Sequence, residues 1–374
     1  MKRCAFRVSV LAAAMALPLS AGAAGTGHLF VSSEKDAAIQ VLDGKTHEVI
    51  KEIGTAARPR HMIFDAKQEK IYVACGDGDA IDVIDVASLS LVDRITGIDD
   101  PEIIELSPDG NTLYISLEDD GELGMLNLTE YFEGREEAPD LTVAEADPQG
   151  SSYDEYDDDD DDDEEEEGDD DDDDDDEGVA GLSTIEVGLE PEGILVTPEG
   201  DTVYVTSEVA NMVHVVDTEA GELTENILVG NRPRRFALSP DGSQLWVSNE
   251  LGASVSIIDT ESNQVAEELS FLPPGFRPED VTPVGVAMTD DGSQAVVALG
   301  RANHVAFVNT SSMEIEDYVL VGTRAWNLAL SKDQKTLYVV NGLSDDITLI
   351  DMETRKATKS IPTGRVPHTL LIDE

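Results

Sequence analysis

Short hydrophobic runs separated by turn-forming residues recur along almost the whole chain. The clearest unit spans residues 230–260, where the apolar runs 236–238, 245–247 and 255–258 are separated by Pro, Asp and Gly. Runs of this length, rich in β-branched and aromatic residues and bounded by turn formers, predict consecutive antiparallel strands.

The middle run of this unit recurs seven times. Its central residues are Phe30, Tyr72, Tyr114, Tyr204, Trp246, Val296 and Tyr338. Their spacing is 42 residues, lengthened once by 48 residues and once by 8. A period of about 40 to 45 residues with several strands per unit is typical of a propeller blade. The sequence therefore predicts an all-β, seven-bladed β-propeller of four-stranded antiparallel blades.

The two ends of the repeat predict how the ring closes. The first repeat begins with the run 29–31 and has no first strand before it, whereas residues 366–372 form a first strand with no second strand after it. Pairing the C-terminal strand with the N-terminal strands would complete the seventh blade and leave no long open edge.

Residues 1–23 have the pattern of a secretory signal peptide. Lys2, Arg3 and Arg7 precede an apolar segment over residues 8–19, and Ala21-Gly22-Ala23 has the form of a cleavage site. The apolar segment is too short to span a bilayer. We therefore expect residues 24–374 to form one periplasmic propeller domain, soluble and monomeric. Cys75 would be its only cysteine, most simply explained as a buried small hydrophobe.

The chain is strongly acidic, with a formal net charge of −56. This charge argues against nucleic acid or an anionic membrane as a partner, because both would be repelled. Residues 154–177 contain 22 acidic residues, interrupted only by Tyr156 and Gly168. They lie in the long insertion, at about 131–178, which the repeat places between the third and fourth strands of the third blade. Its composition predicts disorder, and at most weak, nonspecific binding of cations such as calcium.

The repeat resembles that of the YVTN propeller family. The resemblance rests on the turn motif Ser-Pro-Asp-Gly at 107–110 and 239–242, the aromatic-centred run that follows it, and Ile-Asp-Thr at 258–260. Seven such repeats behind a signal peptide, with Arg-Pro-Arg at 58–60 and 232–234, are most similar to the propellers associated with PQQ-dependent alcohol catabolism. This resemblance implies an exported accessory protein of a quinoprotein oxidation or transport system.

Two classes of enzyme are disfavoured and one stays open. Quinoprotein dehydrogenases resemble larger propellers, many with a disulfide of adjacent cysteines, and haem attachment would need Cys-x-x-Cys-His, which is absent. A metal-dependent hydrolase or lactonase would need side chains that converge in the central tunnel. Candidates at the starts of the inner strands are Glu102, Glu192, His61, Asn327 and His368. His61 and His368 have opposite strand parity, so we expect them to point to different sides and predict no metal site, catalytic residue or cofactor.

Arginines are concentrated at the starts of the inner strands. Most inner strands are expected to begin at a proline. Six of the twelve arginines of residues 24–374 lie either one residue before this position or one or two residues after it. These positions converge on one mouth of the channel, where guanidinium forks could bind a planar anion. The predicted ligand-binding residues are Arg58, Arg60, His61, Arg232, Arg234, Arg235, Arg324, Trp326 and His368.

Two interpretations of these arginines follow. In the first, Arg60, Arg234, Arg235 and Arg324 hold a small anionic ligand, or an acidic segment of a partner, with Trp326 as a stacking wall. In the second, the arginines pair with Glu102, Glu192 and the acidic loops 77–79 and 118–120. We favour the first, and hence a non-catalytic binding or scaffold propeller, with the lactonase-like hydrolase as the alternative.

Overall fold

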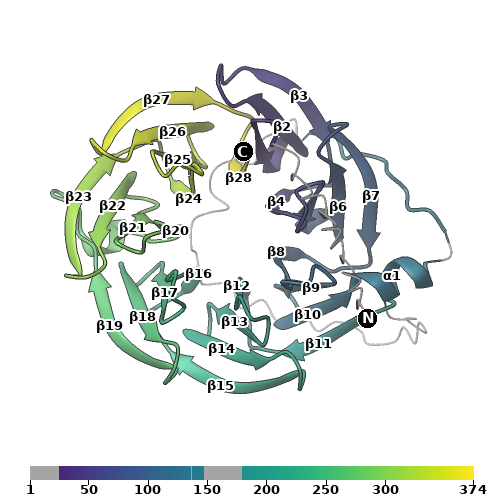
Figure 1. Cartoon of the computed structure of the whole chain (residues 1–374), viewed down its shortest axis with the longest axis horizontal. Coiled ribbons are helices and arrows are strands. Elements are labelled where there is room, and N and C mark those ends of the chain that lie inside the picture. Colours follow the sequence, from purple (N-terminus) through teal and green to yellow (C-terminus); the bar gives the residue numbers. More distant parts are fainter. Residues whose placement is uncertain (1–24, 136, 147–178) are drawn as a thin grey trace, which may run out of the picture.

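The protein forms a ring of seven four-stranded antiparallel sheets around a central axis (Figure 1). The computed structural model describes residues 25–135, 137–146 and 179–374. The seven-bladed propeller predicted from the repeat is confirmed. Within the described residues, no helix is both long and apolar enough to cross a membrane.

The blades are numbered in chain order, and each is given from its inner to its outer strand. Blade 1 contains β28 (Pro367–Asp373), β1 (His28–Ser33), β2 (Ala38–Asp43) and β3 (Val49–Gly54). Blade 2 contains β4 (Pro59–Phe64), β5 (Lys70–Cys75), β6 (Ala80–Asp85) and β7 (Ser90–Thr96). Blade 3 contains β8 (Pro101–Leu106), β9 (Thr112–Leu117), β10 (Glu122–Asn127) and β11 (Leu182–Glu186).

The remaining blades follow the same order without interruption. Blade 4 contains β12 (Pro191–Val196), β13 (Thr202–Ser207), β14 (Met212–Asp217) and β15 (Glu222–Leu228). Blade 5 contains β16 (Pro233–Leu238), β17 (Gln244–Asn249), β18 (Ser254–Asp259) and β19 (Gln264–Ser270). Blade 6 contains β20 (Val286–Met288), β21 (Gln294–Ala298), β22 (His304–Asn309) and β23 (Glu314–Leu320). Blade 7 contains β24 (Ala325–Leu330), β25 (Thr336–Asn341), β26 (Asp346–Asp351) and β27 (Lys356–Pro362).

The C-terminal strand closes the ring as the sequence predicts. β28 pairs antiparallel with β1, and the register places Leu371 opposite Phe30. The two ends of the described chain are therefore joined by a sheet ladder, and β1 is paired on both of its edges.

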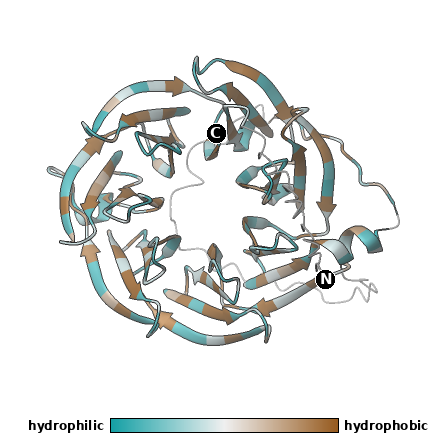
Figure 2. Ribbon diagram, in the orientation of Figure 1, coloured by the Kyte–Doolittle hydropathy of each residue, from teal (hydrophilic) through white to brown (hydrophobic). Residues whose placement is uncertain are grey.

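The core lies between neighbouring blades. Tyr204 of blade 4 packs with Leu245 and Val247 of blade 5, and Trp246 of blade 5 packs with Val297 of blade 6. Figure 2 shows hydrophobic positions alternating with polar positions along the strands of the blades. The centre of the second strand, aromatic in six blades and Val296 in blade 6, is thus a contact with the next blade, which explains why the run recurs with the blade period.

The start of the long insertion differs from the sequence expectation. Residues 128–134 form the short helix α1 (Leu128–Gly134), capped by the side chain of Asn127. Residues 137–146 then pass outside blade 2 towards blade 1 (Figure 1), where the Ala144 amide donates to the Thr55 carbonyl. Buried Arg94 donates to the carbonyls of Asp140 and Thr142. We call residues 137–146 the strap. Residues 147–178, and with them the acidic run, lie outside the described residues, and so do residues 1–23, which the sequence predicts to be a signal peptide.

Candidate functional site

A repeated backbone device positions the side chains around the channel. The residue before most inner strands is left-handed, as in Arg232 (φ 55°) and Arg324 (φ 61°). The ladder then skips residues, for example between Pro233 and Phe236, which is a β-bulge. A bulge turns two successive side chains, such as Arg234 and Arg235, toward the axis.

Hydroxyl groups on the second strands stabilise these bulges. The Arg235 amide donates to the Ser248 hydroxyl over 3.0 Å, and the Ile103 amide donates to the Ser116 hydroxyl over 2.8 Å. The equivalent hydroxyl of Thr206 accepts from the Gly193 amide and donates to the carbonyl of Arg234 in the next blade. The buried amides at the bulge therefore keep a hydrogen-bond acceptor, because a side-chain hydroxyl replaces the missing bond of the ladder.

The first residue of each inner-strand bulge, and Val284 in blade 6, where the β20 ladder has no bulge, contribute to a buried layer across the channel mouth. All seven residues at this level are less than 9% exposed: Arg60, Glu102, Glu192, Arg234, Val284, Trp326 and His368. They come from all seven blades, so the channel is closed at this level. We call this layer, together with the charged residues that pair with it, the plug.

Arg234 is the centre of the plug. Its Nε lies 2.6 Å from a Glu250 carboxylate oxygen, and its Nη1 lies 2.6 Å from Glu208 and also pairs with Glu192. Glu192 in turn pairs with Arg235 and Arg60. One buried guanidinium thus bridges three carboxylates from blades 4 and 5.

The other arginines are engaged in the same way. Arg232 pairs with Glu208, and Arg324 lies 3.3 Å from Glu250. Arg58 lies 3.0 Å from Glu102, which also pairs with Arg60. The mouth is therefore an ion-paired plug, whereas the favoured sequence interpretation expected open arginines. The ion pairs with Glu102 and Glu192 are those that the second interpretation of the sequence expected.

Of the acidic partners, Glu118 was expected only as part of the loop 118–120, and Glu34, Glu208 and Glu250 were missed, although the sequence contains a signal for all four. The residue four positions after the centre of each second strand is Glu or Gly in every repeat. In order, these residues are Glu34, Gly76, Glu118, Glu208, Glu250, Gly300 and Gly342. The glutamates follow the second strands directly and so lie on the same face as the arginines that begin the inner strands.

Crowding among the carboxylates shifts their pKa values in both directions. Burial opposes ionisation of Glu192, but the guanidiniums of Arg234, Arg235 and Arg60 outweigh it and hold its pKa well below the usual range. For Glu118, burial together with the Glu192 and Glu102 carboxylates outweighs Arg60 and Arg234 and raises its pKa to about 9. Burial and the Glu192 carboxylate raise the pKa of Glu208 to about 7, although Arg234 acts in the opposite direction.

Three carboxylates of the plug are close enough to suit a metal ion. Oxygens of Asp100, Glu102 and Glu118 lie within 4.8 Å of one another. Arg58 and Arg60 contact Glu102 directly, and Arg58 also lies 3.3 Å from Asp100. The two guanidiniums therefore supply the positive charge that a cation would otherwise bring.

Trp326 and His368 are part of the plug and not of an open surface. The guanidinium carbons of Arg324 and Arg234 lie 4.9 and 5.3 Å from the centre of the Trp326 ring. His368 is 1% exposed, and burial together with Arg60 and Arg235 holds its pKa well below the usual range. The ring that was expected to stack on a ligand is already in contact with two arginines.

Below the plug, the channel widens into a cavity of about 120 Å³. Four polar side chains line it, each from a different blade: His61, Glu105, Arg235 and Asn327. His61 lies in this cavity and His368 in the plug. The later residues of the inner strands, such as Leu195 and Leu238, are partly exposed and pack against the core between blades 4 and 5.

The groups in this cavity differ in charge. Burial, helped by the nearby Arg235, lowers the pKa of His61 to about 3, so its imidazole is neutral. Burial raises the pKa of Glu105 to about 7, so its carboxyl is half protonated near neutrality. Arg235 donates to the Glu192 carbonyl and carboxylate through Nη1. The cavity therefore combines a cation, a neutral imidazole, an amide and a proton-sharing carboxyl.

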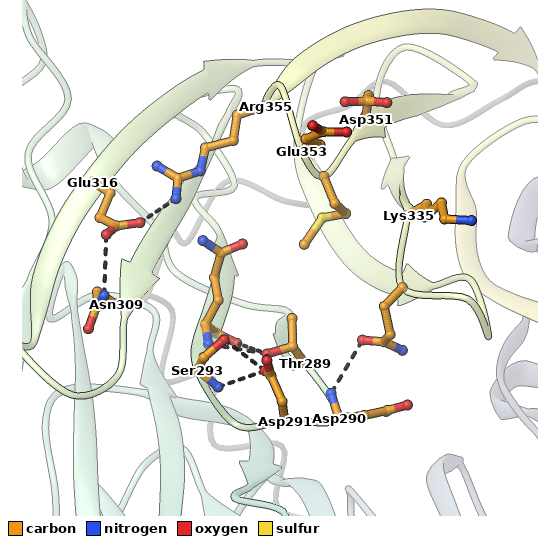
Figure 3. Close-up of a pocket in the computed structure, with 13 residues that line it drawn as sticks. Thr289, Asp290, Asp291, Ser293, Asn309, Glu316, Lys335, Asp351, Glu353 and Arg355 are labelled. Atoms are coloured by element: carbon orange, nitrogen blue, oxygen red, sulfur yellow. Dashed lines mark hydrogen bonds and ion pairs between the residues drawn. The ribbon is translucent and has the colours of Figure 1, made fainter.

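A larger polar groove lies between blades 6 and 7 (Figure 3). Its volume is about 660 Å³, and it is built from connections on the face opposite the plug. Arg355 pairs with Glu316 there, while Asp291 accepts hydrogen bonds from Thr289 and Ser293. Blade 6 has Val296 where the other six blades have an aromatic ring, so no aromatic side chain of this position reaches the groove.

Comparison with known proteins supports the fold and gives one functional lead. Residues 226–370 match the family model described as lactonase, 7-bladed beta-propeller. The match covers less than half of the chain, from the end of β15 into β28. A search of curated proteins found no match.

Solved propellers resemble the whole described ring. The periplasmic gluconolactonase of Pseudomonas aeruginosa has 18% identity and a TM-score of 0.68 over 93% of this chain and 99% of its own. A functionally unknown protein from Desulfotomaculum acetoxidans has 14% identity and a TM-score of 0.69 over 93% and 99%. Hydrazine synthase of Kuenenia stuttgartiensis has 18% identity and a TM-score of 0.65 over 87% and 92%. At these identities the likeness concerns the fold.

Proposed function

We propose that this protein is an exported, non-catalytic binding propeller that holds a small carboxylate-bearing ligand in the channel cavity. The observation that carries the proposal is the meeting of His61, Glu105, Arg235 and Asn327 from four blades at one cavity. Concave sites with a few convergent polar groups are the usual form of small-molecule sites.

The chemistry of the cavity favours a short-chain acid. Arg235 provides the fixed cation, and Asn327 and protonated Glu105 provide hydrogen-bond donors for carboxylate oxygens. Because a cavity of about 150 Å³ holds a benzene molecule, the smaller space here suits a ligand of roughly six non-hydrogen atoms or fewer. The anion site proposed here therefore lies in the channel beneath the arginine-rich mouth, whereas the sequence analysis expected it at the mouth itself.

The YVTN-type repeat and the amino-terminal segment support the biological context. They are similar to those of propellers that accompany PQQ-dependent alcohol catabolism. We therefore place the protein in the periplasm, beside a quinoprotein oxidation or transport system, with no cofactor of its own.

Calorimetry with acetate, lactate and glycolate tests the proposal. We expect binding to wild type that Arg235→Met weakens about tenfold or more, while Arg277→Met on an exposed loop leaves it unchanged. Circular dichroism and thermal melting must first show that Arg235→Met keeps its fold, and Asn327→Ala provides a second, milder variant. Binding that persists unchanged in both channel variants places the ligand elsewhere.

Proton linkage provides a further readout. A bound carboxylate favours the protonated form of Glu105, so affinity should rise as the pH falls from about 8 to about 6, around the pKa of about 7. Glu105→Gln should remove most of this pH dependence. A pH-independent affinity in wild type would contradict the role given to Glu105.

A lactone hydrolase is the second candidate, and the partial lactonase match favours it. Glu105, with a pKa of about 7, could activate water near neutral pH, and Arg235 could stabilise a developing oxyanion. Turnover of an aldonolactone by purified protein, lost in Glu105→Gln and retained in Glu219→Gln, would establish hydrolysis. Binding of acids without turnover supports the binding propeller.

A further inference from the structure

Exposed apolar side chains gather on the plug face between blades 4 and 5. Leu189 is 59% exposed, Val209 57% and Leu251 36%. Each lies in a connection on this face, directly beside Glu190, Glu208 and Glu250 respectively. Val209 and Leu251 line a hollow of about 280 Å³. Exposed apolar groups that surround a hollow with polar groups are typical of protein interaction sites.

The lining of this hollow is polar and charged apart from Val209 and Leu251. Glu190 and Glu208 line it together with Arg232. Arg232 is already paired with Glu208 and lies 3.8 Å from Glu250. The lining of the hollow thus holds two carboxyl groups and one guanidinium, and Glu190 is placed to pair with a cationic group that enters beside Val209 and Leu251.

We propose that this hollow docks a segment of a partner protein that presents a lysine or arginine between two apolar side chains. The cation would pair with Glu190 and Glu208, and the apolar groups would cover Leu189, Val209 and Leu251. The net charge of −56 favours a basic partner and disfavours a second copy of this chain, which would carry the same charge. The inference is independent of the channel ligand, because no residue lines both the hollow and the channel cavity.

A short peptide tests the docking site directly. The probe is fluorescein-labelled Leu-Lys-Leu-amide, measured by fluorescence anisotropy, with the same peptide acetylated on its lysine as the charge control. We expect the lysine peptide to bind with a dissociation constant below about 1 mM, and the acetylated peptide to bind about tenfold more weakly. A higher salt concentration should weaken binding of the lysine peptide and have little effect on binding of the acetylated peptide.

Matched variants locate the site. Val209→Ser and Leu251→Ser should each weaken the lysine peptide about tenfold. Leu272 is 52% exposed and lies on the same face in the next connection, so Leu272→Ser should leave binding of the lysine peptide unchanged. Arg235→Met in the channel should also leave this binding unchanged. The proposal is overturned if wild type does not bind the lysine peptide, if acetylation makes no difference, or if Leu272→Ser acts like the two hollow variants.

Discussion

At the scale of single residues, the bulge of the inner strands decides where functional side chains lie. Each bulge brings one residue into the plug and the next into the channel, as Arg234 and Arg235 illustrate. Gly193 shows how tightly the device is built, because a Cβ there would lie 2.1 Å from the Arg234 carbonyl. The hydroxyl of Ser248 or Thr206 then provides the hydrogen bond that the ladder has lost.

Ser248→Ala should therefore destabilise the protein. It leaves the buried Arg235 amide without its acceptor, so the free energy of unfolding should fall by about 1 to 3 kcal/mol. Denaturant unfolding measures the change, with Ser262→Ala on an exposed turn as the control. A loss no larger than that of the control would show that water replaces the hydroxyl.

Glu118→Gln should stabilise the protein at alkaline pH. The folded-state pKa of Glu118 is raised to about 9, so keeping this carboxyl protonated costs stability as the pH rises from about 4.5 towards 9. We expect the Tm of wild type to fall between pH 5 and pH 9, and the variant to exceed it at pH 8 but not at pH 5. Glu219→Gln, on an exposed turn, should match wild type at both pH values.

At the scale of elements, the strap joins blades that are separate in the repeat. It lies outside β7 and reaches β3, where Ala144 bonds to Thr55, and it provides carbonyl partners for Arg94. Arg94 is itself paired with buried Asp82. The strap is thus part of the packed structure, although it begins an insertion whose overall composition predicts disorder.

Two deletions separate the strap from the acidic run. Replacing residues 147–178 with a short Gly-Ser linker should change the free energy of unfolding by about 1 to 2 kcal/mol at most, because loop closure depends weakly on length. Extending the deletion back to residue 137 should cost about 1 to 3 kcal/mol more, since it removes the acceptors of Arg94. Equal free energies of unfolding of the two deletion variants would mean that the strap does not stabilise the fold.

At the scale of the whole molecule, closure of the ring by β28 links the two ends of the chain. Truncation after Arg365 would remove the inner strand of blade 1 and expose its neighbour β1. Because blades are stabilised by their neighbours, we expect loss of cooperative folding or a Tm lowered by several degrees, and not local fraying. Thermal melting followed at both Trp fluorescence and far-ultraviolet circular dichroism measures this, and an unchanged midpoint would contradict it.

The sequence by itself determined the blades, their number, the closing strand and the convergence of arginines on one mouth. These follow from local patterns: a strand is specified by alternation over a few residues, and the repeat carries that alternation around the ring. Only the tertiary structure decided that the arginines are paired and that the polar cavity lies beneath them. Arg234 bonds to glutamates at positions 192, 208 and 250, which the chain separates by tens of residues, and the bulge determines which side chains meet. Ionisation and access depend on such distances between blades, and a one-dimensional pattern does not contain them.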